Sequence, residues 1–160
     1  MKKVFYNRQA ALAYANVWAY SRNPKYYDFS NLGGDCTNYI SQCIFAGINV
    51  MNYTAPTGWY YINSSKRTAS WTSAAFLGKF LISNNGAGPL GSLVAKSEIE
   101  VGDIIQLSFQ NNVFTHSLFV VSAYPEITIA THTNDAYDRP ISSYTYEKIR
   151  YIHIAGGQKY

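Results

Sequence analysis

This 160-residue sequence contains few charged residues, and the basic ones are dispersed. Charged residues make up 14% of the chain, compared with about 25% in typical globular proteins. The 13 lysines and arginines are adjacent only at Lys2-Lys3 and Lys66-Arg67. Nucleic-acid binding requires a basic stripe or cluster, so the sequence argues against a nucleic-acid partner. The net charge of +4 is better suited to polyanionic surroundings such as an anionic cell wall.

The sequence also lacks long apolar runs, repeats and linkers. No window approaches the roughly 18 consecutive apolar residues of a membrane span. We therefore expect no membrane-spanning segment. The N-terminus carries two lysines but has neither an apolar signal core nor a small-residue cleavage site. The chain would then be a mature form or an excised domain if it acts outside the cytoplasm. We expect one domain over residues 1–160 and a monomer.

Cysteine is scarce, and the two present are not expected to form a disulfide. Cys36 and Cys43 are seven residues apart and fall within one expected helix. At 1.5 Å rise per residue their Cα atoms would be about 10 Å apart, which is beyond disulfide reach. We therefore predict that Cys36 is free and that Cys43 belongs to the core.

The hydrophobic pattern changes along the chain from a helical period to a period of two. The apolar spacing predicts helices at 7–20, 36–45 with Gly47 near its cap, and 70–81. The alternation predicts strands at 103–109, 113–124, 127–133 and 148–155. We interpret 49–67 as an irregular excursion, 86–91 as a loop and 134–143 as a polar connection. Helices followed by an antiparallel sheet indicate the α+β class.

The stretch from Gly33 to Gly47 contains the first chemically suggestive residue, Cys36. Glycines before a helix allow a tight turn and close approach to a ligand. A cysteine in the first turn of a helix lies at the positive end of the macrodipole, which favours the nucleophilic thiolate. The alternative is a buried core cysteine, because free cysteine is among the most buried residue types. The choice depends on a base elsewhere in the chain.

Three histidines could provide that base. A neutral imidazole within reach of a thiol takes its proton, and a further polar group orients the ring. His116 lies in an expected strand, and the alternation of the next strand places His132 and Asn134 on one side. Either could hold the His116 ring, and Asp135 is adjacent. We interpret His153 as structural.

Two further features concern ligands. His132 and Asp135 offer metal-ligand atoms, but neither paired cysteines nor an HExxH spacing accompanies them. We therefore predict no metal site and no cofactor. Irregular segments often build binding clefts, so the aromatic excursion with Trp59 and Tyr60, together with the Trp71 helix, is predicted to wall the substrate cleft.

Several motifs resemble a known family. They are Tyr6-Asn7-Arg8, Asn23-Pro24, Gly33-Gly34-Asp35-Cys36-Thr37-Asn38-Tyr39, Ser41-Gln42, Gly58-Trp59-Tyr60, Ser70-Trp71-Thr72, Gly102-Asp103-Ile104, His116-Ser117 and His132-Thr133. In this order the motifs are similar to those of the bacterial putative amidase domain family of the NlpC/P60 and CHAP type. The resemblance runs from about residue 6 to residue 154, and the run around Cys36 is its most specific part.

The resemblance implies a papain-like fold, in which a helix begins with the cysteine and packs on a C-terminal antiparallel sheet that holds the histidine. It implies cysteine-dependent cleavage of amide bonds in peptidoglycan or another cell-wall peptide, and a secreted or wall-associated protein. Carried over by position, Cys36 would be the nucleophile, His116 the general base and His132 the residue that orients the imidazole. Asn134 is the alternative third residue.

Two other functions remain open. A transglutaminase-type acyl transferase uses the same order of cysteine and histidine, and an added amine would distinguish it because only acyl transfer incorporates the amine efficiently. A non-catalytic wall-binding module would bind wall fragments equally well after alkylation of Cys36.

Overall fold

The computed structural model describes residues 1–160 and combines four α-helices with a seven-stranded antiparallel sheet, which confirms the α+β prediction. The helices are α1 (Arg8–Trp18), α2 (Cys36–Ile48), α3 (Ala69–Thr72) and α4 (Ala74–Ser83). The strands of the sheet are β1 (Lys2–Val4), β4 (Gly88–Val94), β5 (Ile104–Ser108), β6 (Phe114–Ser122), β7 (Thr128–Thr131), β8 (Ala136–Pro140) and β9 (Lys148–Lys159). A separate hairpin consists of β2 (Tyr61–Asn63) and β3 (Lys66–Arg67).

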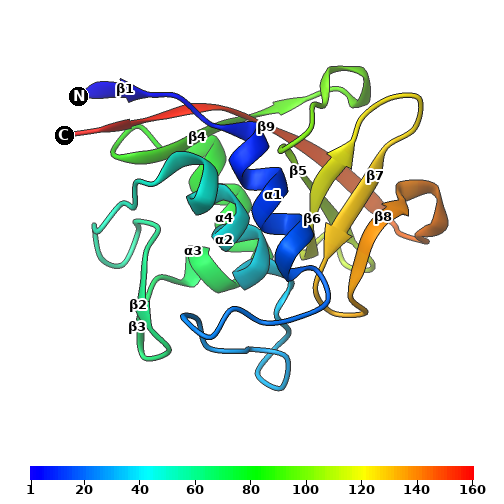
Figure 1. Ribbon diagram of the computed structural model, residues 1–160, viewed down its shortest axis with the longest axis horizontal. Coiled ribbons are helices and arrows are strands. Elements are labelled where there is room, and N and C mark those ends of the chain that lie inside the picture. Colours follow the sequence, from blue (N-terminus) through cyan, green and yellow to red (C-terminus); the bar gives the residue numbers. More distant parts are fainter.

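The sheet follows the order β1-β9-β5-β6-β7-β8, and β4 also pairs with β9. Both termini lie together at one end of the molecule, because β1 pairs with the end of β9 (Figure 1). The two cores lie on opposite faces of the central strands, since Phe119 of β6 packs with the helices whereas Leu118 belongs to the second core. None of the helices is both long and apolar enough to cross a membrane.

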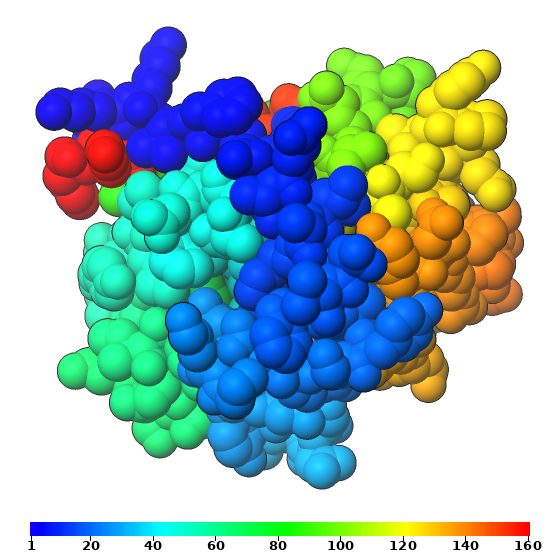
Figure 2. Space-filling model, in the orientation of Figure 1, coloured from blue at the N-terminus to red at the C-terminus, as the bar shows by residue number.

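The first helix lies where the sequence predicts it. Asn7 caps α1 by accepting a hydrogen bond from the backbone N–H of Ala10 at 3.0 Å. Ala11 and Ala15 are fully buried, and their small side chains allow α1 to pack closely against α2. Figure 2 shows α1 on the surface, between the cyan chain at the end of α2 and the orange chain of β8.

The second helix begins at Cys36 as expected but continues past residue 45 to Ile48. Gly47 lies inside the helix rather than at its cap, and a Cβ there would come within 2.5 Å of the Tyr6 ring. The cap is Asn49, in the left-handed conformation at φ 54°. Both cysteines are free, and Cys43 is completely buried, as predicted.

Three further expectations were wrong. The helix expected at 70–81 is two helices, because Ser73 adopts an extended conformation between α3 and α4. The expected loop at 86–91 contributes to β4, and the expected polar connection at 134–143 contains β8. These strands lack clear apolar alternation, and they form because β9 and β7 offer them unpaired backbone edges.

The tryptophans expected to wall a cleft lie instead in the core. Trp59 and Trp71 are fully buried with ring centroids 4.7 Å apart. Their indole N–H groups donate to Ser41 Oγ at 3.1 Å and Asn38 Oδ1 at 3.0 Å, both on α2. Tyr60 is half-buried, and its ring packs 5.6 Å from that of Tyr53. The prediction failed because buried indoles find partners on α2.

Candidate active site

Cys36 is the first residue of α2 and lies against the sheet. Its Sγ is 3.7 Å from Thr37 Oγ1 and 4.0 Å from the carbonyl oxygen of Thr115 on β6. The chain enters the helix through Gly33 and Gly34, at φ +88° and +100°. A Cβ on Gly34 would also approach the hydroxyl of Thr133 to 3.3 Å. Glycine is therefore required where this loop meets the β7–β8 turn.

Cys36 and His116 line the same hollow, which has a volume of about 380 Å³. His116 is on β6, one residue beyond the carbonyl that faces the thiol. No hydrogen bond joins the thiol to the imidazole. The hollow is lined by Gly33, Gly34, Cys36, Phe109, Thr115, His116, Thr133, Asn134, Arg139 and Tyr144. The structure therefore brings together Cys36, His116 and Asn134 from three separate parts of the chain.

A second hollow of about 340 Å³ lies on the other side of Cys36. Its walls include Leu32, Arg67 and Val113 and the start of α4. The two hollows share Gly33, Gly34, Cys36 and Thr115. Cys36 thus borders both hollows, which are together called the groove.

A chain of buried polar groups fixes the start of α2 on the sheet. Thr37 Oγ1 and Ser117 Oγ are 2.9 Å apart, and Gln106 Nε2 donates to Ser117 Oγ at 3.1 Å. Gln106 also donates to the carbonyl oxygen of Ala74, the first residue of α4, at 2.7 Å. Because Ser117 follows His116, these bonds set the position of the thiol relative to the imidazole. No signal in the sequence indicated these bonds, although Thr37 lies within the most specific motif.

Burial keeps both reactive groups neutral. Desolvation raises the pKa of the Cys36 thiol, which opposes the thiolate that the helix N-terminus was expected to favour. Desolvation, together with the nearby Arg139 charge, lowers the pKa of His116 from 6.5 to about 4. At neutral pH the site therefore holds a thiol and a neutral imidazole rather than an ion pair.

His132 does not contact the His116 ring. Its Nδ1 is 2.5 Å from Asp35 Oδ2, and its Nε2 donates to the carbonyl oxygen of Trp18 at 2.8 Å. Both ring nitrogens are thus engaged by partners other than His116. The ring also stacks on Tyr39 of α2, with centroids 4.0 Å apart. These bonds leave His132 no nitrogen to orient His116, contrary to the expected role.

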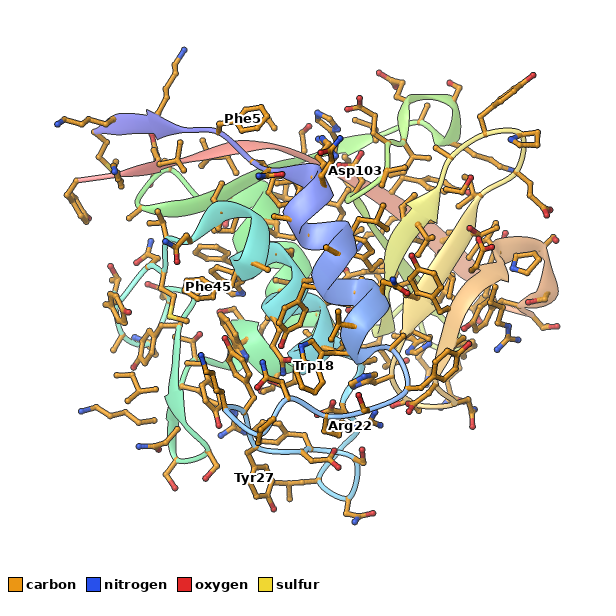
Figure 3. The ribbon with its side chains drawn as sticks, viewed as in Figure 1. Phe5, Trp18, Arg22, Tyr27, Phe45 and Asp103 are labelled. Carbon is orange, nitrogen blue, oxygen red and sulfur yellow. The ribbon has the colours of Figure 1, made fainter.

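Asp135 and Asn134, the other two candidates for the residue that orients the His116 ring, differ in their surroundings. Asp135 is held by Arg22, whose Nη1 and Nη2 lie 2.9 and 3.0 Å from the carboxylate oxygens. Figure 3 shows Arg22 just beyond the end of α1, near Trp18. Asn134 is exposed, its side chain makes no hydrogen bond, and it lines the hollow with His116. Asn134 alone of the three shares the hollow with His116.

Two residues at the hollow had no signal in the sequence. Arg139, on β8, places its guanidinium carbon 3.8 Å from the centre of the Tyr144 ring. Tyr144 is one of fifteen tyrosines, so nothing in the sequence distinguished it. Its hydroxyl is buried without a hydrogen-bond partner. Both residues became candidates only when the sheet placed them beside Cys36.

His153 belongs to a network remote from the groove, as its structural interpretation predicted. Its Nδ1 is 2.9 Å from Asp103 Oδ2, and Arg8 Nη1 donates to Asp103 Oδ1 at 2.7 Å. Glu100, Asp103 and His153 each offer one atom that could bind a cation, and these three atoms lie within 4.8 Å of one another. The Arg8 guanidinium already supplies a positive charge there, so the cluster ties the start of α1 to the sheet.

The fold and the groove define an α+β protein that presents a cysteine and a histidine to one hollow. Residues 5–155 match the putative amidase domain family, and the chain belongs to that family. The family description indicates hydrolysis of amide bonds. The chain is also 37% identical over 122 residues to the uncharacterized protein YhbB of Bacillus subtilis, a match that covers 73% of this chain. It covers only 37% of that relative's length. No solved structure matches the chain.

Proposed function

We propose that this chain is a cysteine-dependent amide hydrolase that cleaves bacterial cell-wall peptidoglycan. The observation that carries the proposal is the shared hollow, which is lined both by Cys36 at the start of α2 and by His116 on β6. Membership of the amidase family supports an amide substrate.

In the first half of the reaction, Cys36 Sγ attacks the carbonyl carbon of the amide as His116 accepts the thiol proton. The C–N bond then breaks, the imidazolium gives its proton to the departing amine, and a thioester remains on Cys36. In the second half, His116 accepts a proton from water, whose oxygen attacks the thioester carbon. The S–C bond breaks, and the proton returns to the thiol as the carboxylic acid leaves. Because the resting groups are neutral, proton transfer accompanies the attack.

The oxyanion formed at each stage requires hydrogen-bond donors. The backbone N–H of Cys36, as the first residue of α2, has no hydrogen-bond partner. It lies at the positive end of the helix dipole and is the first candidate donor. Asn134 is the candidate for orienting His116, because its amide lines the same hollow.

Two broader features of the proposal rest on the resemblance of the motifs around Cys36, His116 and His132. The first is a papain-like fold of the NlpC/P60 type, which agrees with a helix that begins at the cysteine and packs on an antiparallel sheet. The second is action at the cell wall by a secreted or wall-associated protein, which agrees with the net charge of +4.

Mass spectrometry of peptidoglycan before and after digestion tests the function. We expect new amine and carboxylate ends with the wild-type protein and none with Cys36→Ala, while circular dichroism shows an unchanged fold. Cleavage by Cys36→Ala would contradict the proposal. Incorporation of an added amine would identify an acyl transferase, and binding without cleavage would identify a wall-binding module.

A further inference from the structure

The groove contains arginines but no acidic residue. Arg139 lines the hollow that holds His116, and Arg67 lines the hollow on the other side of Cys36. Neither hollow is lined by aspartate or glutamate. Neither arginine forms a salt bridge, in contrast to Arg8 and Arg22. The groove therefore has a positive charge on each side of the thiol.

The two arginines are held in similar ways, by uncharged partners. Arg139 donates from Nε to Ser143 Oγ at 2.7 Å, and its guanidinium stacks on the Tyr144 ring. Arg67 donates from Nε to Thr72 Oγ1 at 3.3 Å, and its guanidinium carbon lies 4.5 Å from the centre of the Phe29 ring. Each keeps one terminal nitrogen without a hydrogen bond: Nη1 of Arg139 and Nη2 of Arg67. A stacked arginine with a free terminal nitrogen is already oriented for an incoming carboxylate.

Tyr144 provides an independent observation. Its hydroxyl is the single buried side-chain nitrogen or oxygen in the protein with no hydrogen-bond partner, and the residue lines the hollow with Arg139 and Cys36. Leaving a buried hydroxyl unpaired is costly, and native proteins rarely do so. A substrate oxygen that enters the hollow would satisfy this donor.

We propose that the groove binds an amide substrate with a carboxylate on each side of the bond to be cut, one held by Arg139 and Tyr144 and the other by Arg67. The inference rests on the proposed function, because it names the substrate class of the same site. A carboxylate suits both positions, because its oxygens can accept hydrogen bonds from a guanidinium and from a hydroxyl at once. The absence of acidic residues removes the repulsion that would otherwise oppose such a substrate.

Binding to the Cys36→Ala protein separates recognition from catalysis. The probes are soluble stem peptides from peptidoglycan, prepared with free carboxylates and as the corresponding carboxamides, and titration calorimetry measures their affinities. We expect the carboxylate form to bind at least about ten-fold more tightly, the usual effect of a hydrogen bond to a charged group. Arg139→Gln and Arg67→Gln, each added to Cys36→Ala, should each reduce this preference by about three-fold, because each removes one of the two carboxylate sites. Lys159→Gln removes one charge outside the groove and should leave it unchanged.

Tyr144→Phe distinguishes ligand binding from a structural role. Because the hydroxyl is unpaired, its removal should leave the melting temperature unchanged or raise it, while the carboxylate peptide binds several-fold more weakly. Equal or undetectable binding of the two peptide forms overturns the proposal, as does an unchanged preference in Arg139→Gln. If wild-type protein releases no fragments although this preference holds, the hydrolase function fails and the recognition stands.

Discussion

Asp35 and His132 form a buried pair, with 2.5 Å between Oδ2 of the carboxylate and Nδ1 of the ring. Both side chains are almost completely inaccessible. Asp35 immediately precedes Cys36, and its Oδ1 accepts from the backbone N–H of Phe29 at 2.8 Å. The pair therefore joins the loop that leads to Cys36, the proposed nucleophile, to β7, the strand that ends just before His132. Its role is to hold the start of α2 in place.

The first prediction concerns this pair. His132→Ala removes the nearest partner of Asp35 Oδ2 and leaves that oxygen only the more distant Arg22 Nε, at 3.6 Å. It should therefore lower the free energy of unfolding by roughly 1–3 kcal/mol. His116→Ala should cost less stability, because the His116 ring makes no hydrogen bond, but it should abolish activity. Urea denaturation followed by circular dichroism measures both. Equal stability losses in the two variants would contradict this assignment.

The second prediction follows from the raised pKa of the Cys36 thiol. An ion-paired thiolate would be alkylated at a constant rate down to acidic pH, whereas a neutral thiol reacts appreciably only as the pH approaches its pKa. We therefore expect the rate of iodoacetamide labelling at Cys36 to rise throughout pH 5–9 without a plateau. Mass spectrometry locates the label, and Cys36→Ala should remain unlabelled because Cys43 is fully buried.

The third prediction uses the lowered pKa of His116, about 4. Its ordinary value is about 6.5, so the unfolded chain binds this proton first as the pH falls. The contribution of His116 should thus reduce stability progressively from about pH 6.5 to about pH 4, by at most roughly 3 kcal/mol. His116→Gln removes the titrating group, so between pH 7 and pH 4.5 its urea midpoint should fall less than that of the wild type. Identical declines would contradict the prediction.

The fourth prediction separates core from cleft. Trp71→Phe removes the donor to the buried Asn38 Oδ1 and should reduce stability by about 1–3 kcal/mol. Because Trp71 lines neither hollow, kcat/KM of the refolded protein should stay within about two-fold of wild type at a temperature well below its Tm. A large rise in KM with normal stability would restore Trp71 to the substrate cleft.

Local signals were sufficient for several features. Asn7 is a helix-capping residue followed by small apolar residues, and α1 begins where that pattern places it. Cys36 precedes an apolar run with helical spacing, and α2 begins there. The strand that includes His116 contains a continuous apolar run at 118–121, so its existence and type were predictable. In each case neighbouring residues in the chain carry the information, because hydrogen bonding and burial repeat with the period of the element.

Other features depended on distant partners. Gly88-Pro89 and the polar residues of β8 do not have a strand-like pattern. They form strands because they pair with the open edges of β9 and β7. The indoles of Trp59 and Trp71 lie in the core because α2 offers them hydrogen-bond acceptors. His132 was assigned to the wrong neighbour, since the strand pattern gives its side of the sheet but not which acceptors its nitrogens will meet.

For this protein, the sequence by itself determined the α+β class and the helix that starts at Cys36, and it led to the proposal of Cys36 and His116 as the reactive pair. Only the tertiary structure decided that burial raises the pKa of the Cys36 thiol, that His132 pairs with Asp35, and that Arg139 and Tyr144 line a hollow together with Cys36. The physical reason is that desolvation and hydrogen-bond partnership depend on groups brought together from remote parts of the chain. The order of residues along one helix or strand does not specify them.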